Sequence, residues 1–262
     1  MELDNLAFGA DGLEVERSIR GDHHRQLELL ERAVRLASEI LTIAEIGNRE
    51  GRKLIAAGLL GRLVLAAQAG ALLILRGLEH DAAISIRTCL ELAAKLKACS
   101  IHPEFHRTYI ASDIIRRLKL ARGGLQLTGL TEDRRARLQA LEIELSQQAD
   151  ALEARELKVE EVCRLAQMDD DYNSVFRLTS SAVHSAPRLL EDFIETHEGR
   201  VTGFNFEPRK GKASIYFATI SEYLLRGTRE FAQLVGVDRA DTWNALWIDH
   251  QGSVPEWPQV AD

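Results

Sequence analysis

Arg177 and His184 are the two side chains whose types and spacing best suit acid–base chemistry. They are seven residues apart in the predicted helix 172–185, and at 3.6 residues per turn they share one face. Imidazole exchanges protons near neutral pH, and guanidinium binds phosphate or stabilises an anionic transition state. The side chains expected to bind or orient beside them are Tyr172, Asn173, Ser180 and Ser181. These residue types at this spacing predict a site for proton transfer. The pattern taken by itself, however, favours a structural alternative, in which the histidine is hydrogen-bonded and the arginine is ion-paired.

A second charged pair lies in the predicted helix 82–100. Arg87 and Glu91 are four residues apart and face the same way, among mainly apolar neighbours. Because buried charge needs a partner, we expect this pair to lie inside the protein. It either orients Arg177 or His184 from a facing helix or forms an internal salt bridge that fixes helix register.

Other candidate patterns are weaker. His102 and His106 have the spacing of two helix-borne metal ligands, but no third ligand is signalled nearby, so no metal site is predicted. The segment 204–212 interleaves phenylalanines with cations, which suits stacking on single-stranded nucleic acid but is more typical of a solvated loop. Without a glycine-rich phosphate loop, nucleophile elbow or paired-cysteine motif, the sequence predicts no cofactor.

The elements that position these residues are predicted to be long helices. The 262 residues include only 18 Gly and 5 Pro, below the roughly 12% that is average for the two types together. Leu and Ala, two strong helix formers, are frequent. This composition predicts an all-α, multi-helix bundle and argues against a β-sandwich, a collagen-like chain or a disordered tail.

The helical periodicity predicts how the chain is organised. We expect N-terminal helices in residues 1–48, a helical bundle in residues 49–238 and a short helix with a tail in residues 239–262. Within the bundle, Gly123-Gly124 should end one helix. The mostly polar helix 131–157 should form a projecting arm or hairpin. The expected helices are 23–46, 49–78, 82–100, 104–122, 131–157, 172–185, 188–196 and 213–235, with a loop at 201–212.

Charge and cysteine content indicate the surroundings of the protein. The 33 Lys and Arg against 40 Asp and Glu give a net charge of −7, which weighs against a nonspecific nucleic-acid binder but leaves room for a local basic patch. The three cysteines, Cys89, Cys99 and Cys163, form an odd set without metal-ligand spacing, as expected for a reducing cytoplasm.

No membrane span or signal peptide is expected. The most apolar stretch, residues 54–78, is interrupted by Arg62, Gln68 and Arg76, so it is interpreted as a buried core helix. The N-terminal residues lack a basic segment before an apolar run.

Two segments resemble known all-helical families. The segments 83–91 and 172–184 resemble the "LLRsllE" and "Y…S…H" helices of an uncharacterised bacterial family. The second segment is also similar to the Arg, four to six residues, His motif of HEPN domains, many of which are metal-independent ribonucleases in toxin and phage-defence systems. The resemblance implies catalytic roles for Arg177 and His184, with Leu178 standing where HEPN domains often have a polar residue. It also implies a homodimer in which the two motifs face each other.

Two functions of different classes follow. The first is a metal-independent HEPN-like endoribonuclease that acts on RNA as a toxin or phage-defence effector. The alternative is a noncatalytic helical module of a defence or toxin–antitoxin system, which binds a partner protein or an anionic ligand.

Overall fold

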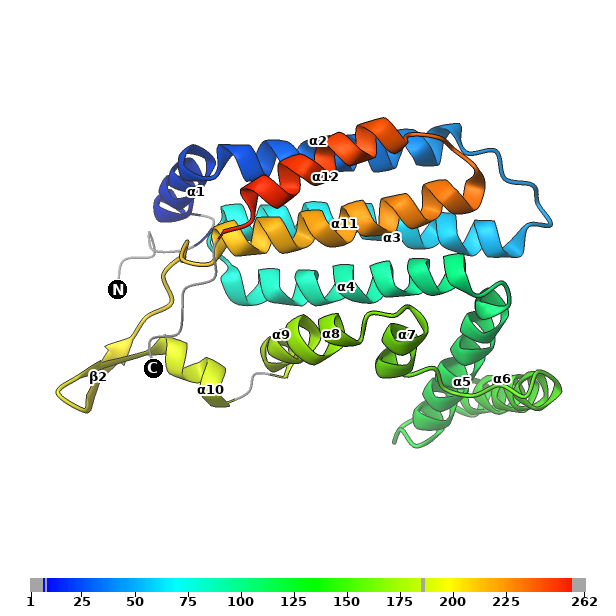
Figure 1. Ribbon diagram of the computed structural model, residues 1–262. Helices are drawn as coiled ribbons and strands as arrows, with labels where there is room; N and C mark the ends of the chain where they lie inside the picture. Colours follow the sequence, from blue (N-terminus) through cyan, green and yellow to red (C-terminus); the bar gives the residue numbers. More distant parts are fainter. Residues whose placement is uncertain (1–6, 8, 185–186, 256–262) are drawn as a thin grey trace.

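The computed structural model describes residue 7, residues 9–184 and residues 187–255. Their fold is all-α, as predicted, with one short β-hairpin (Figure 1). The long helices are α1 (Ala10–Asp22), α2 (His24–Ile43), α3 (Gly51–Leu75), α4 (Glu79–Ile101), α5 (Phe105–Leu125), α6 (Glu132–Ala151), α11 (Ala213–Val235) and α12 (Ala240–Ser253). The shorter elements are α7 (Val159–Leu165), α8 (Asp169–Asp171), a π-helix η1 (Tyr172–Phe176), α9 (Arg177–Val183), α10 (Pro187–Leu190), a 3₁₀-helix η2 (Glu191–Phe193), β1 (Ile194–His197) and β2 (Arg200–Phe204).

The core of the bundle lies where α3, α4 and α11 meet. These helices run side by side, with α2 and α12 on one side and the α7 to α9 segment on the other (Figure 1). Small residues allow the close approach, because a Cβ added to Gly70 of α3 would lie 2.6 Å from Cδ1 of Ile220 in α11. The main hydrophobic cluster draws buried residues from α1 to α4, α11 and α12 alike.

Helix α3 is long and apolar enough to cross a membrane by length and composition, the one such helix among the described residues. In this structure 56% of its most apolar window is buried. It contacts α2, α4, α5 and α11, so it serves as the core helix predicted for residues 54–78.

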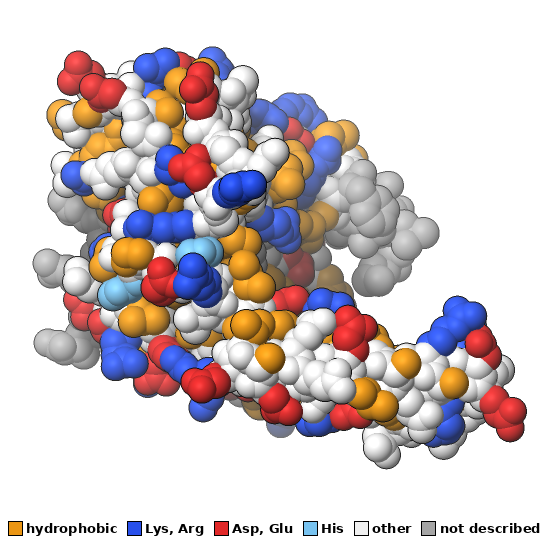
Figure 2. All heavy atoms as spheres, turned by 90° about the vertical axis from the view of Figure 1, so that its right-hand side faces the viewer, with side chains coloured by type: hydrophobic (Ala, Val, Ile, Leu, Met, Phe, Trp, Pro, Cys, Tyr) orange, Lys and Arg blue, Asp and Glu red, His pale blue; other side chains and the backbone are white. Residues whose placement is uncertain are grey.

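Helices α5 and α6 form a projecting hairpin, the arm that the sequence predicts. Figure 2 shows it extending from the bundle with apolar, acidic and basic side chains interspersed. The arm has a small core of its own, formed by Ile114, Leu118, Ala121, Leu145 and Ala149. Thr131 caps α6, as its sequence indicates, by accepting a hydrogen bond from the Arg134 backbone N–H.

Three local predictions were wrong. Helix α5 continues through Gly123-Gly124 to Leu125, because its last turns pack along α6 and tertiary contact outweighs the low helix propensity of glycine. The predicted helix 188–196 stops early, and the predicted loop 201–212 begins inside a strand. There, antiparallel β1 and β2 pair around a turn in which Gly199 has a φ of +73°. The predicted helix end at Ser185 and Ala186 lies outside the described residues.

Candidate functional site

The Arg177–His184 segment is not one regular helix. The chain runs from α8 through one π-helical turn, η1, into α9. In a π-turn residues i and i+5 face each other, whereas in an α-helix they lie about 140° apart at 3.6 residues per turn. The turn therefore brings Tyr172 next to Arg177, and the Arg177 guanidinium carbon lies 5.6 Å from the centroid of the Tyr172 ring.

Arg177 is exposed, and no carboxylate among the described residues pairs with it. Its contact is the Tyr172 ring, which in turn stacks on Phe176 at 4.9 Å between centroids. The stack fixes the direction of the guanidinium toward the N-terminal turn and leaves its N–H groups open to a ligand. Tyr172 is thus the aromatic side chain in contact with Arg177, and its orienting role stays a prediction.

His184 ends α9 as its C-cap residue and is also exposed. Its backbone N–H donates to the Ser180 carbonyl, and within the described ranges its imidazole has no recorded partner. Arg177 and His184 point to the same side of α9, as the spacing predicts, because α9 is a regular α-helix from Arg177 onward. Along the axis, however, seven residues span about 10 Å at 1.5 Å per residue. Arg177 leans away from His184, so one chain does not bring the two groups together.

The small polar residues of the segment are mostly engaged with the backbone or with α4. Ser181 Oγ donates to the Leu178 carbonyl at 2.7 Å, and Ser180 Oγ accepts from Nη1 of Arg87 at 3.0 Å. Asn173 is exposed. None of these contacts reaches the imidazole of His184.

Arg87 and Glu91 form an internal charged network, which is the structural alternative predicted for this pair. Arg87 Nε donates to Glu91 Oε1 at 3.2 Å, and the guanidinium carbon lies 4.2 Å from the Phe176 ring centroid. Lys95 approaches the second Glu91 oxygen at 3.7 Å, and burial lowers the pKa of Lys95. The pair therefore holds η1 and α9 against α4, and the contacts of Arg87 are to this network rather than to Arg177 or His184.

A second anchor of the segment was missed by sequence reasoning. Asp171 accepts two hydrogen bonds from Arg226 of α11, at 2.9 and 3.0 Å, and a third from the Tyr223 hydroxyl at 3.0 Å. Burial raises the pKa of Glu222, which also accepts from Arg226 at 3.2 Å. The run of three aspartates before Tyr172 was the available signal, but a partner on α11 is visible only in three dimensions.

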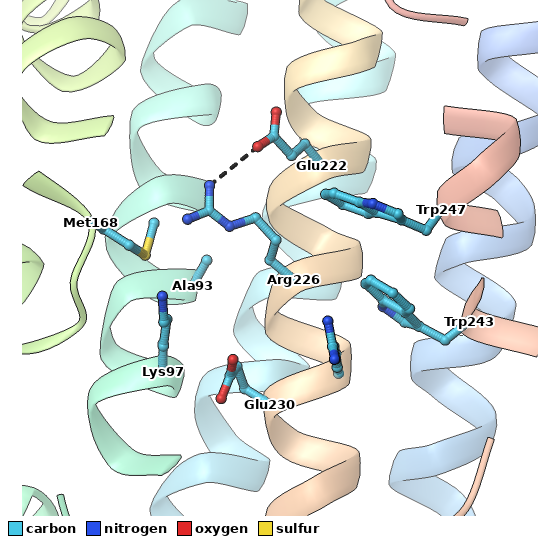
Figure 3. Close-up of a pocket in the computed structure, with 9 residues that line it drawn as sticks. Ala93, Lys97, Met168, Glu222, Arg226, Glu230, Trp243 and Trp247 are labelled. Atoms are coloured by element: carbon cyan, nitrogen blue, oxygen red, sulfur yellow. Dashed lines mark hydrogen bonds and ion pairs between the residues drawn. The ribbon is translucent and has the colours of Figure 1, made fainter. Parts of the chain in front are cut away.

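A hollow of about 400 Å³ opens beside this second anchor, between α4, α11 and α12. Figure 3 shows Trp243 and Trp247 side by side at one wall, with Lys97 and Glu230 at the other. The tryptophan rings stack 5.1 Å apart, and Arg229 covers Trp243 at 4.7 Å. Trp243 donates its indole N–H to the Leu225 carbonyl, so this wall is first of all a packing contact of α12 on α11.

The other candidate groups have structural partners. His102 Nε2 lies 3.0 Å from the Leu165 carbonyl and His106 Nδ1 lies 2.9 Å from the Pro103 carbonyl. In the described part of the chain, no three His, Cys, Asp or Glu side chains cluster as metal ligands would. The cysteines are free and buried, and burial raises the pKa of Cys89 to about 12, which makes it a poor nucleophile.

The region that contains the Arg87 network and Asp171 matches a known family model. Residues 53–201 match DUF5677, which is described as a family of unknown function. The chain belongs to this family. The DUF5677 match runs from α3 to β2 and contains the Arg87 network, Asp171, Arg177 and His184. No curated protein and no solved structure matches the chain.

Proposed function

We propose that this DUF5677 protein is a metal-independent, HEPN-like endoribonuclease that works as a homodimer in the cytoplasm, as a toxin or phage-defence effector. The observation that supports this proposal is a contrast between the segment of Arg177 and His184 and the helices α4 and α11 that pack on it. Arg177 and His184 are exposed and lack carboxylate partners among the described residues, while the neighbouring Arg87 and Arg226 are fully engaged. Exposed polar side chains without carboxylate partners on one face are available to bind a substrate.

The two side chains supply the groups that RNA cleavage needs. A base removes the 2′-hydroxyl proton, the 2′-oxygen attacks phosphorus, and an acid protonates the departing 5′-oxygen. In this scheme His184 transfers protons, and Arg177 stabilises the negative charge of the phosphorane. The products are a 2′,3′-cyclic phosphate and a 5′-hydroxyl end.

The distance between the two groups supports a two-chain site. Seven helical residues separate them by about 10 Å, and Arg177 leans away from His184. In a homodimer with facing α9 helices, Arg177 of one chain meets His184 of the other. The exposed apolar side chains of Leu178 and Val183 on the same helix suit such a contact.

The test is cleavage of total RNA or transfer RNA in the presence of a chelator. His184→Ala and Arg177→Ala should each lower the rate by about 10²- to 10⁴-fold, the usual contribution of acid–base catalysis. The matched controls, His24→Ala and Arg134→Ala, change exposed residues of α2 and α6 and should leave the rate unchanged. Mixing the two inactive variants should restore partial activity, because some heterodimers contain one intact site. Equal cleavage by wild type and His184→Ala, or no cleavage by the wild type, would contradict the proposal.

The arm gives specific support to the alternative of a noncatalytic module that binds a partner protein. Its helices project from the bundle (Figure 2). Leu120 and Ile143 on these helices and Leu127 in the loop between them are exposed. An anionic ligand between the Arg87 and Arg177 helices has less support, because the Arg87 guanidinium is committed to Glu91 and Ser180. Pull-down from the native host with wild type and with a variant lacking the arm tests this alternative. Identical sets of bound proteins would argue against it.

A further inference from the structure

The hollow between α4, α11 and α12 holds two side chains of opposite charge that do not pair with each other. Lys97 of α4 and Glu230 of α11 both line it, and both are half-buried. Figure 3 marks an ion pair between Glu222 and Arg226 but none between Lys97 and Glu230. In the described part of the chain, neither Lys97 nor Glu230 has a recorded hydrogen bond or ion pair with any other residue. One ammonium and one carboxylate are therefore available at this hollow.

The other charged side chains of the hollow are engaged. Arg226 pairs with Asp171 and with Glu222, and the Arg229 guanidinium lies over the Trp243 ring. A partly buried charge that has lost water is costly unless an opposite charge or a hydrogen bond replaces it. A ligand that carries both a negative and a positive group would satisfy the two unpaired side chains together.

Apolar side chains complete the walls of the hollow. Ala93 and Met168 are buried, whereas Trp247 is half-buried, so part of its indole surface is open to a ligand. The volume of about 400 Å³ lies within the range of about 300–1,000 Å³ that is usual for small-molecule sites. The hollow is therefore complementary to a small molecule with two opposite charges and an apolar part.

We propose that this hollow binds a free amino acid with an apolar side chain, in its zwitterionic form. Lys97 donates to the carboxylate of the ligand, Glu230 accepts from its ammonium, and Trp247 covers its side chain. A simple organic anion or amine fits less well, because each would leave one of the two charged side chains without a partner. This inference does not depend on whether the protein cleaves RNA.

Tryptophan fluorescence of the full-length protein tests this binding. In the Trp257→Phe variant the two remaining tryptophans are Trp243 and Trp247, and both line the hollow. L-Phenylalanine and L-leucine should each change the fluorescence in a saturable way. 3-Phenylpropionate, which lacks the ammonium, and phenethylamine, which lacks the carboxylate, should each bind about 10-fold more weakly than L-phenylalanine. No saturable response to either amino acid up to about 10 mM would overturn the proposal.

Two substitutions test the contacts assigned to the charged side chains. Lys97→Met should weaken L-phenylalanine binding about 10-fold and leave phenethylamine binding unchanged, because the amine has no carboxylate. Glu230→Gln should weaken L-phenylalanine binding similarly and leave 3-phenylpropionate binding unchanged. The matched controls, Lys158→Met and Glu132→Gln, change exposed residues outside the hollow and should alter none of these affinities. Equal affinity of the wild type for L-phenylalanine and 3-phenylpropionate would assign the hollow to an organic anion and overturn the zwitterion.

Discussion

Two arginines on facing helices, Arg87 and Arg177, differ in what surrounds them. The Arg87 side chain is 18% exposed and contacts Glu91, Ser180 and Phe176, whereas Arg177 is exposed and contacts the Tyr172 ring. Both were candidate site residues by pattern. Their surroundings separate a residue engaged by three neighbouring side chains from one whose recorded contact, among the described residues, is one aromatic ring.

This difference predicts opposite effects of the same substitution. Arg87→Met removes the Arg87 hydrogen bonds to Glu91, which keeps its contact with Lys95, and to the Ser180 hydroxyl, and should cost about 1–3 kcal/mol of unfolding free energy. Arg177→Met loses an exposed cation–π contact and should cost no more than about 1 kcal/mol. Urea unfolding of both variants measures the difference. Equal losses would mean that Arg177 is as structural as Arg87.

His250 predicts how stability depends on pH. It is 3% exposed, and its Nδ1 has no hydrogen-bond partner in the described part of the chain. Burial lowers its pKa below 6.5 in the folded state, so below about pH 6.5 the unfolded state binds more protons. Stability should therefore fall as pH drops from 7.5 to 5.5.

The measurement is the thermal midpoint of the wild type and of His250→Phe across this range. The variant should show a smaller decrease on acidification. Part of the decrease should remain, because burial also lowers the pKa of His80. A wild-type midpoint that rises on acidification would contradict the assignment.

At the scale of elements, the π-turn and the arm depend on tertiary partners. The segment of the π-turn is held on one side by the Arg87 network of α4 and on the other by Arg226 of α11. The arm is held mostly by contacts between α5 and α6. The π-turn is therefore coupled to the bundle, whereas the arm is more independent of it.

The independence of the arm gives an element-scale prediction. Leu145 is fully buried in the small core of the arm, and Leu145→Ala should cost about 2–5 kcal/mol locally. Hydrogen exchange should become faster in α6 while α3 and α11 stay protected. Leu60→Ala, in the main core, is the matched substitution and should accelerate exchange throughout the bundle. Uniform acceleration by both would show that arm and bundle unfold together.

At the scale of the whole molecule, close packing of α11 on α3 and α4 sets the shape of the bundle. A Cβ added to Gly227 of α11 would lie 2.5 Å from Cδ2 of Leu63 and 3.0 Å from Cδ1 of Leu96. By contrast, a Cβ at Gly61 of α3 would meet nothing within 4 Å. The two helical glycines therefore have different roles.

The same substitution at these glycines should change stability in opposite directions. Gly61→Ala should stabilise the protein by about 0.5–1 kcal/mol through helix propensity. Gly227→Ala forces two leucines aside and should destabilise it by about 1–3 kcal/mol. Denaturant midpoints check both variants. Stabilisation by Gly227→Ala would show that α11 and α3 can move apart without cost.

The sequence by itself determined the all-α class, the core role of α3, the Thr131 cap and the α11 bounds. These depend on local periodicity and capping, which a single chain displays directly. The sequence also identified the charged and polar residues around Arg177 and His184 as candidates, because such residues are unusual inside apolar helices.

Only the tertiary structure decided what those residues do. The link from Asp171 to Arg226 joins residues 55 positions apart, and the π-turn that places Tyr172 under Arg177 has no periodic signature in the sequence. The same holds for the β-hairpin and for α5 continuing through two glycines. Each depends on contacts between segments distant along the chain, and helical periodicity does not report such contacts.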